Sequence, residues 1–311
     1  MPDTSSGFTE ADVPDQSGKC FSGKCFVVTG ANTGLGFEAA RVLAMRGARV
    51  VLACRSEARA DEAMRRIRAL APAADLGFLP FDQADLDSIR RAAVELDGEP
   101  RIDALVNNAG VMMPPLSRTQ QGFELQFGVN HLGSFAFTAL MLPKLAATPG
   151  SRVVITGSLA HISGRIDWDD PNAERSYRRW PRYRMSKLAN LLFLFELDRR
   201  LRAAGSSVMA LGCHPGIAGT DLGRHLPAVG LAWAAFRPFL NTPAMGAWPT
   251  LQAATGAVTP GAYYGPQGFR EIKGSSGVAR RAPHATDPAL ARRLWDLSVE
   301  MTGIEPALPP A

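Results

Sequence analysis

Short apolar runs alternate with longer helical segments along most of this chain. The runs are rich in β-branched residues, whereas the segments between them show the periodicity of α-helices. We expect strands at 24–29, 48–54, 76–81, 102–106, 152–156 and 207–211, and helices at 35–46, 57–71, 86–96, about 120–147, about 182–204 and 287–303. This alternation predicts an α/β fold in which a doubly wound parallel sheet carries helices on both faces.

No linker or internal repeat interrupts this pattern, which predicts a single domain over residues 19–311. With 46% hydrophobic and 20% charged residues, the chain can bury a substantial core. Residues 1–18 are polar and lack the apolar core of a signal peptide, so we expect a disordered lead-in there. The four cysteines lack CxxC spacing and a histidine partner pattern, which favours reduced thiols in a cytoplasmic protein.

Polar residues and glycines follow each expected strand at the point where it ends. In a parallel sheet these points share one edge, which is where ligands bind. The first of them is the turn 30–36 (GANTGLG), which lies between a strand and a helix. Its glycines allow a tight turn and close approach of a pyrophosphate, which the helix N-terminus attracts through its N–H groups and dipole. An ordinary glycine turn is the alternative, but this context favours a Rossmann-type nucleotide site.

The end of the second expected strand indicates which nicotinamide cofactor is preferred. An NAD site usually has a carboxylate there, which binds the ribose 2′-hydroxyl. This chain has no acid at 53–56 but has Arg55, which can pair with a 2′-phosphate, and Asn32 and Ser56 can add hydrogen bonds. The alternative is a solvated Arg55. The pattern favours NADP, with NAD as the less favoured cofactor.

Tyr183 lies four residues ahead of Lys187, and this spacing places both side chains on one face of a helix. A neighbouring cation stabilises a phenolate and brings its pKa, about 10 for free tyrosine, closer to neutral pH. Of the four tyrosines, only Tyr183 has a lysine at this spacing. Alone, the pair could be a surface feature, so the prediction depends on Ser158 and the glycine-rich turn as companions.

The order of these motifs resembles that of the short-chain dehydrogenase/reductase superfamily, over about residues 23–220. Finer features resemble its retinol-dehydrogenase-like members: 53–55 (ACR), 127–133 (FGVNHLG), 158–161 (SLAH), 186–190 (SKLAN), 214–216 (HPG) and the 25-residue separation of Ser158 from Tyr183. One departure is Gly157, where a double serine is common. The resemblance implies an NAD(P)-dependent oxidoreductase acting on CH–OH or C=O groups.

In that chemistry the catalytic residues are Asn130, Ser158, Tyr183 and Lys187. Tyr183 would donate a proton to the developing alkoxide, and Ser158 would hydrogen-bond the same oxygen. Lys187 would bind ribose hydroxyls and lower the pKa of Tyr183, while Asn130 would hold a water-linked proton path behind Lys187. Alternatively, Ser158 is a turn residue, Asn130 breaks a helix and Lys187 is a solvated charge.

The resemblance also implies a set of cofactor contacts. Asp82 would contact adenine, Asn108 and Gly110 would line the cofactor floor, and Ile217 and Thr220 would hold the nicotinamide end. The full set is Gly30, Asn32, Thr33, Gly34, Leu35, Gly36, Arg55, Ser56, Asp82, Asn108, Ala109, Gly110, Tyr183, Lys187, Pro215, Gly216, Ile217 and Thr220. No metal site is expected, because the scattered histidines 131, 161 and 214 lack ligand spacing and favour structural roles.

Apolar residues gather in a segment that we expect to cover the substrate, at about 217–249. They favour a lipophilic carbonyl or alcohol, although they could equally pack the core or a subunit interface. Residues 226–240 come nearest to a membrane span, but Arg237 and two prolines interrupt them; peripheral membrane contact is a separate hypothesis. Arg178, Arg179, Arg182 and Arg184 form a basic cluster that is either a solvated face or a contact for an acidic substrate or partner.

Three expectations concern assembly and rival functions. The stretch 188–195 of the expected helix 182–204 is apolar nearly all round, which favours pairing of subunits into a homodimer or homotetramer. The formal net charge of +5 is small and dispersed, which argues against nucleic-acid binding. A non-catalytic nicotinamide-nucleotide sensor or scaffold is the alternative function, but the presence of both Tyr183 and Lys187 argues against it.

Overall fold

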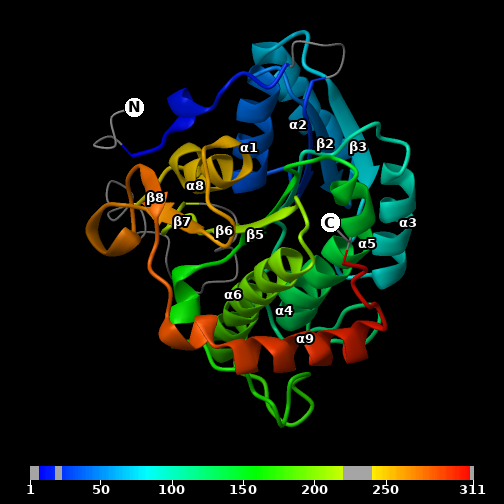
Figure 1. The fold of residues 1–311 in the computed structure, drawn as a ribbon, viewed down its shortest axis with the longest axis vertical. Helices are drawn as coiled ribbons and strands as arrows, with labels where there is room; N and C mark the ends of the chain where they lie inside the picture. The colour runs from blue at the N-terminus through cyan, green and yellow to red at the C-terminus, as the bar shows by residue number, and fades with distance from the viewer. Residues whose placement is uncertain (1–6, 18–22, 220–239, 309–311) are drawn as a thin grey trace.

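Eight strands form one sheet in the computed structural model, which describes residues 7–17, 23–219 and 240–308 (Figure 1). Their order is β3-β2-β1-β4-β5-β6-β7-β8, and all neighbouring pairs are parallel except the last. The strands are β1 (Cys25–Thr29), β2 (Arg49–Cys54), β3 (Leu76–Pro80), β4 (Ala104–Asn107), β5 (Arg152–Thr156), β6 (Met209–Cys213), β7 (Tyr263–Pro266) and β8 (Ser276–Val278). The expected doubly wound α/β sheet is confirmed, and two strands add to the six expected ones: parallel β7 and antiparallel β8.

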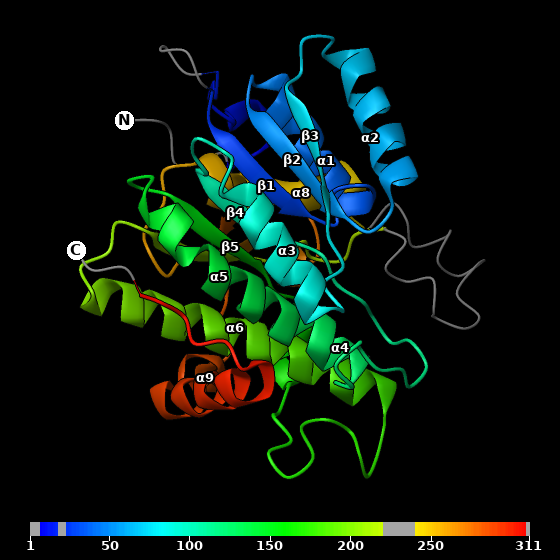
Figure 2. The same cartoon turned by 90° about the vertical axis from the view of Figure 1, so that its right-hand side faces the viewer.

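Helices cover both faces of this sheet (Figure 2). The helices are α1 (Gly34–Met45), α2 (Glu57–Leu70), α3 (Leu86–Leu96), α4 (Leu125–Phe127), α5 (Ser134–Ala146), α6 (Arg179–Ala203), α8 (Pro243–Thr255) and α9 (Pro288–Thr302). Helices α1, α2 and α8 pack on one face, while α3, α5 and α6 pack on the other. Along β1, Phe26 and Val28 are buried on the face covered by α1, α2 and α8, and Val27 is buried on the face covered by α3, α5 and α6. Burial on both faces explains why the strands read as continuous apolar runs.

The expected helix over about 120–147 begins later and is not uniform. The Glu124 carboxylate accepts hydrogen bonds from the backbone N–H groups of Gln126 and Phe127 at 2.8 Å each, which caps α4 and fixes its start. A π-helical turn, η2 (Gly128–Gly133), then joins α4 to α5. Such turns are frequent at functional sites, and this one carries Asn130.

The expectation of a disordered lead-in is wrong for residues 7–17, the part of it that the structure describes. Phe8 pairs with Ser276 beside β8, and Glu10 forms a salt bridge with Arg41 of α1 at 2.9 Å. Gln16 is buried and bonds to Arg46 and Lys24 through backbone groups. These are long-range contacts that a polar composition does not reveal.

Helix α9 explains why the stretch 188–195 of α6 is apolar nearly all round. It lies along the outer side of α6, away from the sheet (Figure 2), and buries Leu294 and Trp295. Phe193 of α6 lies 6.0 Å from Trp295, measured between ring centroids. The second buried face of α6 is therefore covered by the same chain, so the apolar pattern no longer argues for pairing of subunits.

The expected substrate cover at about 217–249 is described only at its two ends. Residues 217–219 follow β6, and Ala218 pairs with Asn241 in an isolated bridge. Residues 243–249 begin α8, and Trp248 is partly buried and packs against the core cluster that α1 and α8 share. The intervening apolar residues, including most of 226–240, lie outside the described residues. Within the described chain, no helix combines the length and apolar character needed to cross a bilayer.

Candidate active site

The turn after β1 has the backbone geometry that its glycines predict. Gly30 and Gly34 have φ values of +67° and +57°, a region that side chains with a Cβ rarely adopt. A Cβ on Gly36 would lie 2.5 Å from the Gly30 oxygen, so α1 approaches the turn too closely for any larger residue. Thr33 is the N-cap of α1, but its side chain makes no capping hydrogen bond. The N-terminal turn of α1 is thus built like an anion cradle.

The loop after β4 is tied to this turn by Thr29. The Thr29 hydroxyl accepts hydrogen bonds from the backbone N–H groups of Asn108 and Ala109, at 3.0 and 2.9 Å. The Asn108 side chain in turn donates to the Thr29 carbonyl at 2.8 Å. The ends of β1 and β4 therefore meet at the point where the strand order reverses, which is where such sheets bind ligands. Gly110 continues the loop, and a Cβ there would lie 3.0 Å from Asn130 Oδ1.

The ends of β2 and β3 carry Arg55, Ser56 and Asp82. Arg55 is exposed and forms no ion pair with another described residue. The Ser56 hydroxyl caps α2 by accepting a hydrogen bond from the Arg59 N–H at 3.4 Å, so it also has a structural role. Asp82 accepts a hydrogen bond from the Ala84 N–H at 2.9 Å, which fixes its carboxylate. A hydroxyl that accepts one bond can still donate another, so the capping role leaves Ser56 able to bind a phosphate.

Asn130 joins the loop after β4 to α6. Its Oδ1 accepts from the Val111 N–H at 2.7 Å, and its Nδ2 donates to the Val111 carbonyl and the Ser186 hydroxyl at 2.9 Å each. Both Nδ2 hydrogens are therefore used, and a further contact has to come through Oδ1. Because Ser186 directly precedes Lys187, these hydrogen bonds fix α6 relative to the loop after β4.

Ser158 and Tyr183 are brought together, as the sequence predicts. Tyr183 is buried, and burial raises its pKa to about 12, while a hydrogen bond with the Ser158 side chain acts in the opposite direction. The expected lowering of this pKa by Lys187 is therefore not observed: desolvation dominates, and Lys187 Nζ lies 6.0 Å from the phenol ring centroid. The Trp180 ring stacks on the Tyr183 ring, with centroids 5.6 Å apart.

Lys187 is buried, which excludes the alternative of a solvated helix charge. Its Nζ donates to the Thr156 carbonyl at 3.0 Å, and the Asn190 side chain donates to the same oxygen at 3.1 Å. Burial lowers the pKa of Lys187 to about 8, and the nearby Cys213 acts against this shift. No carboxylate forms a salt bridge with Lys187 among the described residues, so its charge is available for a ligand.

The segment after β6 is held by the β7–β8 end of the sheet. His214 Nδ1 accepts from the Gly216 N–H at 3.2 Å, and its Nε2 lies 3.2 Å from the Glu271 carboxylate. The Pro215 carbonyl accepts from the Asn241 side chain at 2.8 Å, and Ile217 remains partly exposed. Gly216 has φ +68°, and a Cβ there would lie 2.2 Å from the Ile272 oxygen. Thr220, the last expected contact, lies outside the described residues.

The other histidines have the structural roles that the sequence favours. His161 Nδ1 lies 2.6 Å from the Ser158 carbonyl and its Nε2 accepts from the Ala282 N–H, so it links Ser158 to the C-terminal segment. His131 Nε2 lies 2.8 Å from the Ser298 hydroxyl of α9. Burial lowers the pKa of His161 to about 4 and that of His131 to about 3, so both are neutral at physiological pH.

Sequence reasoning missed two positioning side chains. Gln83 is buried and donates to the carbonyls of Ala109 and Val129, at 3.3 and 2.6 Å, and so supports the loop after β4. Gln126 accepts from the Met113 N–H at 2.8 Å and donates to the Arg179 carbonyl at 3.0 Å. Only the position of Gln83, directly after Asp82 at a strand end, gave a signal in the sequence.

Comparisons with known proteins agree with this geometry. Residues 24–228 match the family model described as short chain dehydrogenase. The chain belongs to the short-chain dehydrogenase family. It is 41% identical to retinol dehydrogenase 13 of Homo sapiens over 290 residues, covering 91% of this chain and 86% of that protein. Retinol dehydrogenase 12 of Homo sapiens is 40% identical, with 91% and 87% covered.

Solved structures of this short-chain dehydrogenase's relatives show the same fold. An uncharacterized protein from Mycobacterium paratuberculosis has 39% identity and a TM-score of 0.80, covering 97% of this chain and 100% of that one. A short chain dehydrogenase from Burkholderia cenocepacia in complex with NADP has 24% identity and a TM-score of 0.61, covering 78% and 95%. The chain is thus a retinol-dehydrogenase-like family member, an oxidoreductase acting on alcohols or carbonyls.

The buried lysine of this family member makes its stability depend on pH. The folded-state pKa of Lys187 is about 8 against 10.5 for a free lysine, so the folded state binds fewer protons between these values. Stability should therefore rise with pH through this window. We expect the ligand-free protein to gain about 2–3 kcal/mol between pH 7 and pH 10, relative to Lys187→Met.

Urea unfolding of both proteins at several pH values measures this gain. Lys144→Met is the matched control, because Lys144 lies at the surface, where it donates to the Asp97 carbonyl. Its difference from the wild type should not change with pH. A Lys187→Met difference that is constant from pH 7 to pH 10 would show that Lys187 is hydrated.

Proposed function

We propose that the protein is an NAD(P)-dependent oxidoreductase that transfers hydride between nicotinamide, preferably of NADP, and a lipophilic carbonyl or alcohol. The observation that carries this proposal is the convergence of three buried or half-buried groups, Ser158, Tyr183 and Lys187, beside the loop after β4. Ser158 follows β5, and Lys187 donates to Thr156, the last residue of β5, at the same edge of the sheet as the glycine-rich turn after β1. A proton donor, an oxyanion partner and a nucleotide cradle therefore share one location.

The residues fit a dinucleotide. The positive φ values of Gly30 and Gly34 and the N-terminus of α1 that follows them suit a pyrophosphate. Asn32, Thr33, Leu35 and Gly36 belong to the same turn, and Asp82, Ala109 and Gly110 follow strands that flank it. We propose that these residues hold the cofactor, and that Pro215, Gly216 and Ile217 hold its nicotinamide end. The bound cofactor would supply the hydride.

The chain's own residues would then handle one proton. With a pKa near 12, the Tyr183 hydroxyl is protonated at neutral pH and can donate its proton to the carbonyl oxygen as the oxygen becomes an alkoxide. Ser158 would donate a hydrogen bond to the same oxygen, which stabilises the charge that grows there. Lys187 would hold the ribose hydroxyls, and in oxidation its positive charge would favour the tyrosinate.

Oxidation of NADPH in the presence of a panel of aldehydes and ketones tests this function, and reduction of NADP⁺ by alcohols tests the reverse direction. Turnover of apolar substrates supports the proposal, and the names of the retinol dehydrogenases to which the chain is similar favour that class. Tight binding of the cofactor without turnover of any panel member would instead support the nucleotide sensor or scaffold. Turnover of small charged carbonyls alone would overturn the apolar substrate class.

The NADP preference rests on Arg55. We expect Arg55→Ala to raise the KM for NADPH about 10- to 100-fold, which corresponds to the loss of one or two charge-assisted hydrogen bonds. The KM for NADH should change little. Arg68→Ala is the matched control, since Arg68 is an exposed arginine in the last turn of α2. Equal changes for NADPH and NADH in Arg55→Ala would refute a role in binding the 2′-phosphate.

The cellular location and the oligomeric state can both be tested in solution. We propose a cytoplasmic protein with peripheral membrane contact as a second hypothesis, which flotation with liposomes tests. A homodimer or homotetramer would have to pair through a surface other than the outer face of α6, because α9 covers that face. Sedimentation velocity at several protein concentrations distinguishes such an oligomer from a monomer.

A further inference from the structure

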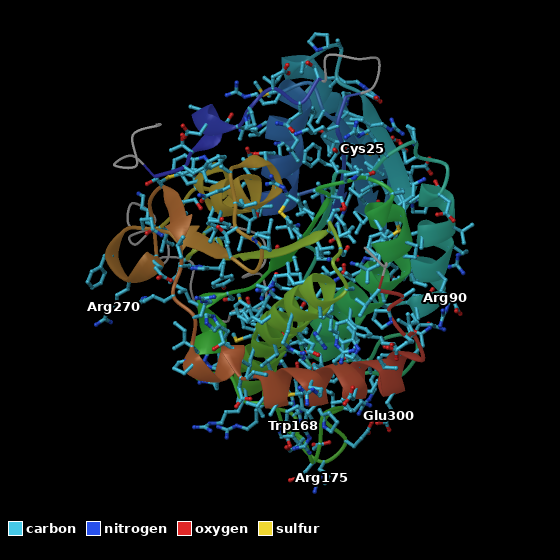
Figure 3. All side chains as sticks on the ribbon, viewed as in Figure 1. Cys25, Arg90, Trp168, Arg175, Arg270 and Glu300 are labelled. Carbon is cyan, nitrogen blue, oxygen red and sulfur yellow. The ribbon has the colours of Figure 1, made fainter. Side chains whose placement is uncertain are left out.

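The arginines near the start of α6 have different surroundings, although the sequence groups them together. Arg182 is buried, and its guanidinium contacts Asp170 at 3.2 Å and the carbonyls of the preceding loop. Arg175 lies at the outer tip of that loop (Figure 3), and Arg178 and Arg179 are exposed. Arg184 is half-buried, forms no salt bridge with a described residue and has a buried Nε without a hydrogen-bond partner. It therefore differs from the rest of the cluster.

An unpaired half-buried guanidinium costs free energy, because its lost hydration is not replaced. The first turn of α6 holds no acidic residue and its N-cap makes no side-chain hydrogen bond. Within the described chain, the local structure therefore offers Arg184 no compensating anion.

Trp180 places Arg184 next to the catalytic tyrosine. The guanidinium carbon of Arg184 lies 4.9 Å from the centroid of the Trp180 ring, and that ring stacks on Tyr183 at 5.6 Å with an angle of 21° between the ring planes. The Trp180 side chain remains 41% exposed. The Trp180 ring thus contacts both the Tyr183 ring and the Arg184 guanidinium. The aromatic surface suits an apolar chain and the guanidinium suits an anion.

From this arrangement we infer that Trp180 and Arg184 form a substrate subsite that binds an anionic group, carboxylate or phosphate, carried by an apolar carbonyl or alcohol. The inference rests on the proposed function for the identity of the reacting group. It narrows the substrate class from neutral lipophilic molecules to amphipathic acids such as oxo-fatty acids. Trp180 packs on the chain and Arg184 pairs with the anion.

Competition between two aldehydes of equal chain length tests the subsite, with decanal as the neutral probe and 10-oxodecanoate as the acidic one. We expect the wild type to favour the acid in kcat/KM by about 10- to 100-fold, the effect of one or two charge-assisted hydrogen bonds. Arg184→Gln should remove this preference, because it should lower kcat/KM for 10-oxodecanoate at least tenfold more than kcat/KM for decanal. Arg184→Lys should retain part of it. Trp180→Ala should raise the KM of both aldehydes.

Arg179→Gln is the matched control, because it removes the same charge from the first turn of the same helix at an exposed position. It should keep the preference for the acid. Equal kcat/KM values for the two aldehydes in the wild type would overturn the inference, as would an equal loss of preference in both glutamine variants. The latter result would indicate a diffuse basic surface.

A binding measurement separates this inference from the proposed function. Isothermal titration with decanoate, decyl phosphate and decanol needs no turnover. We expect both anions to bind more tightly than decanol, and Arg184→Gln to weaken only the anions; their order distinguishes a carboxylate from a phosphate substrate. Anion binding that depends on Arg184 without aldehyde turnover would disprove the oxidoreductase proposal alone. Equal binding of all three probes to the wild type would disprove the subsite alone.

Discussion

Replacing Tyr183 by phenylalanine should lower kcat by about 10²- to 10⁴-fold, the usual contribution of general acid–base catalysis. The change removes one hydroxyl and leaves the ring, which packs against Trp180, in place. The KM of the cofactor should change little, since Lys187 and the glycine-rich turn are untouched. Steady-state oxidation of NADPH measures the first effect, and quenching of tryptophan fluorescence by NADPH measures cofactor binding.

Tyr177→Phe is the control for this experiment. Tyr177 also lies near the loop after β4, where its hydroxyl donates to the Pro114 carbonyl at 2.7 Å and accepts from Gln126 at 3.1 Å. Loss of that hydroxyl removes two neutral hydrogen bonds outside the proton-donating group, so kcat should fall less than tenfold. If Tyr183→Phe also retained kcat within tenfold, Tyr183 would not be the proton donor.

The sheet and the positions of the motifs could be predicted from the sequence because parallel strands carry a strong local signal. The predicted boundaries of helix 86–96 and strand 152–156 agree with α3 and β5 at both ends. The carboxyl ends of neighbouring parallel strands meet at one edge of the sheet, and this argument alone places Gly30, Asn108 and Ser158 together. Long, periodic elements thus need no tertiary information.

Features that depend on long-range contacts could not be predicted. The π-helical turn at Asn130 follows from pairing with Val111, 19 residues away, and no periodicity reports such a contact. The raised pKa of Tyr183 comes from burial, which the spacing to Lys187 does not reveal. Arg184 and Arg182 look equivalent in a basic run, yet only Arg182 meets the carboxylate of Asp170. In each case the feature depends on a residue that is not adjacent in sequence or on burial in the folded protein.

Replacing Trp295 by alanine should destabilise the protein by about 3–5 kcal/mol, the usual cost of truncating a buried large aromatic residue. Trp295 is 3% exposed and its ring meets Phe135 edge-on, with centroids 5.3 Å apart. The Arg200 guanidinium carbon also lies over the Trp295 ring, 4.2 Å from the ring centroid. Urea unfolding followed by circular dichroism measures the loss, which is large against a typical total of about 5–15 kcal/mol.

Two further variants test whether the loss of stability comes from the buried contact between α9 and α6. Trp295→Phe keeps an aromatic ring in the cluster and should cost less than Trp295→Ala. Trp168→Ala removes a tryptophan that is only partly buried, in the loop below α9 (Figure 3), so its cost should also be smaller. An unfolding free energy of Trp295→Ala within 1 kcal/mol of the wild type would mean that α9 contributes little. Because Tyr183 and Lys187 lie on α6, the expected result would instead make the C-terminal helix a structural requirement for the active site.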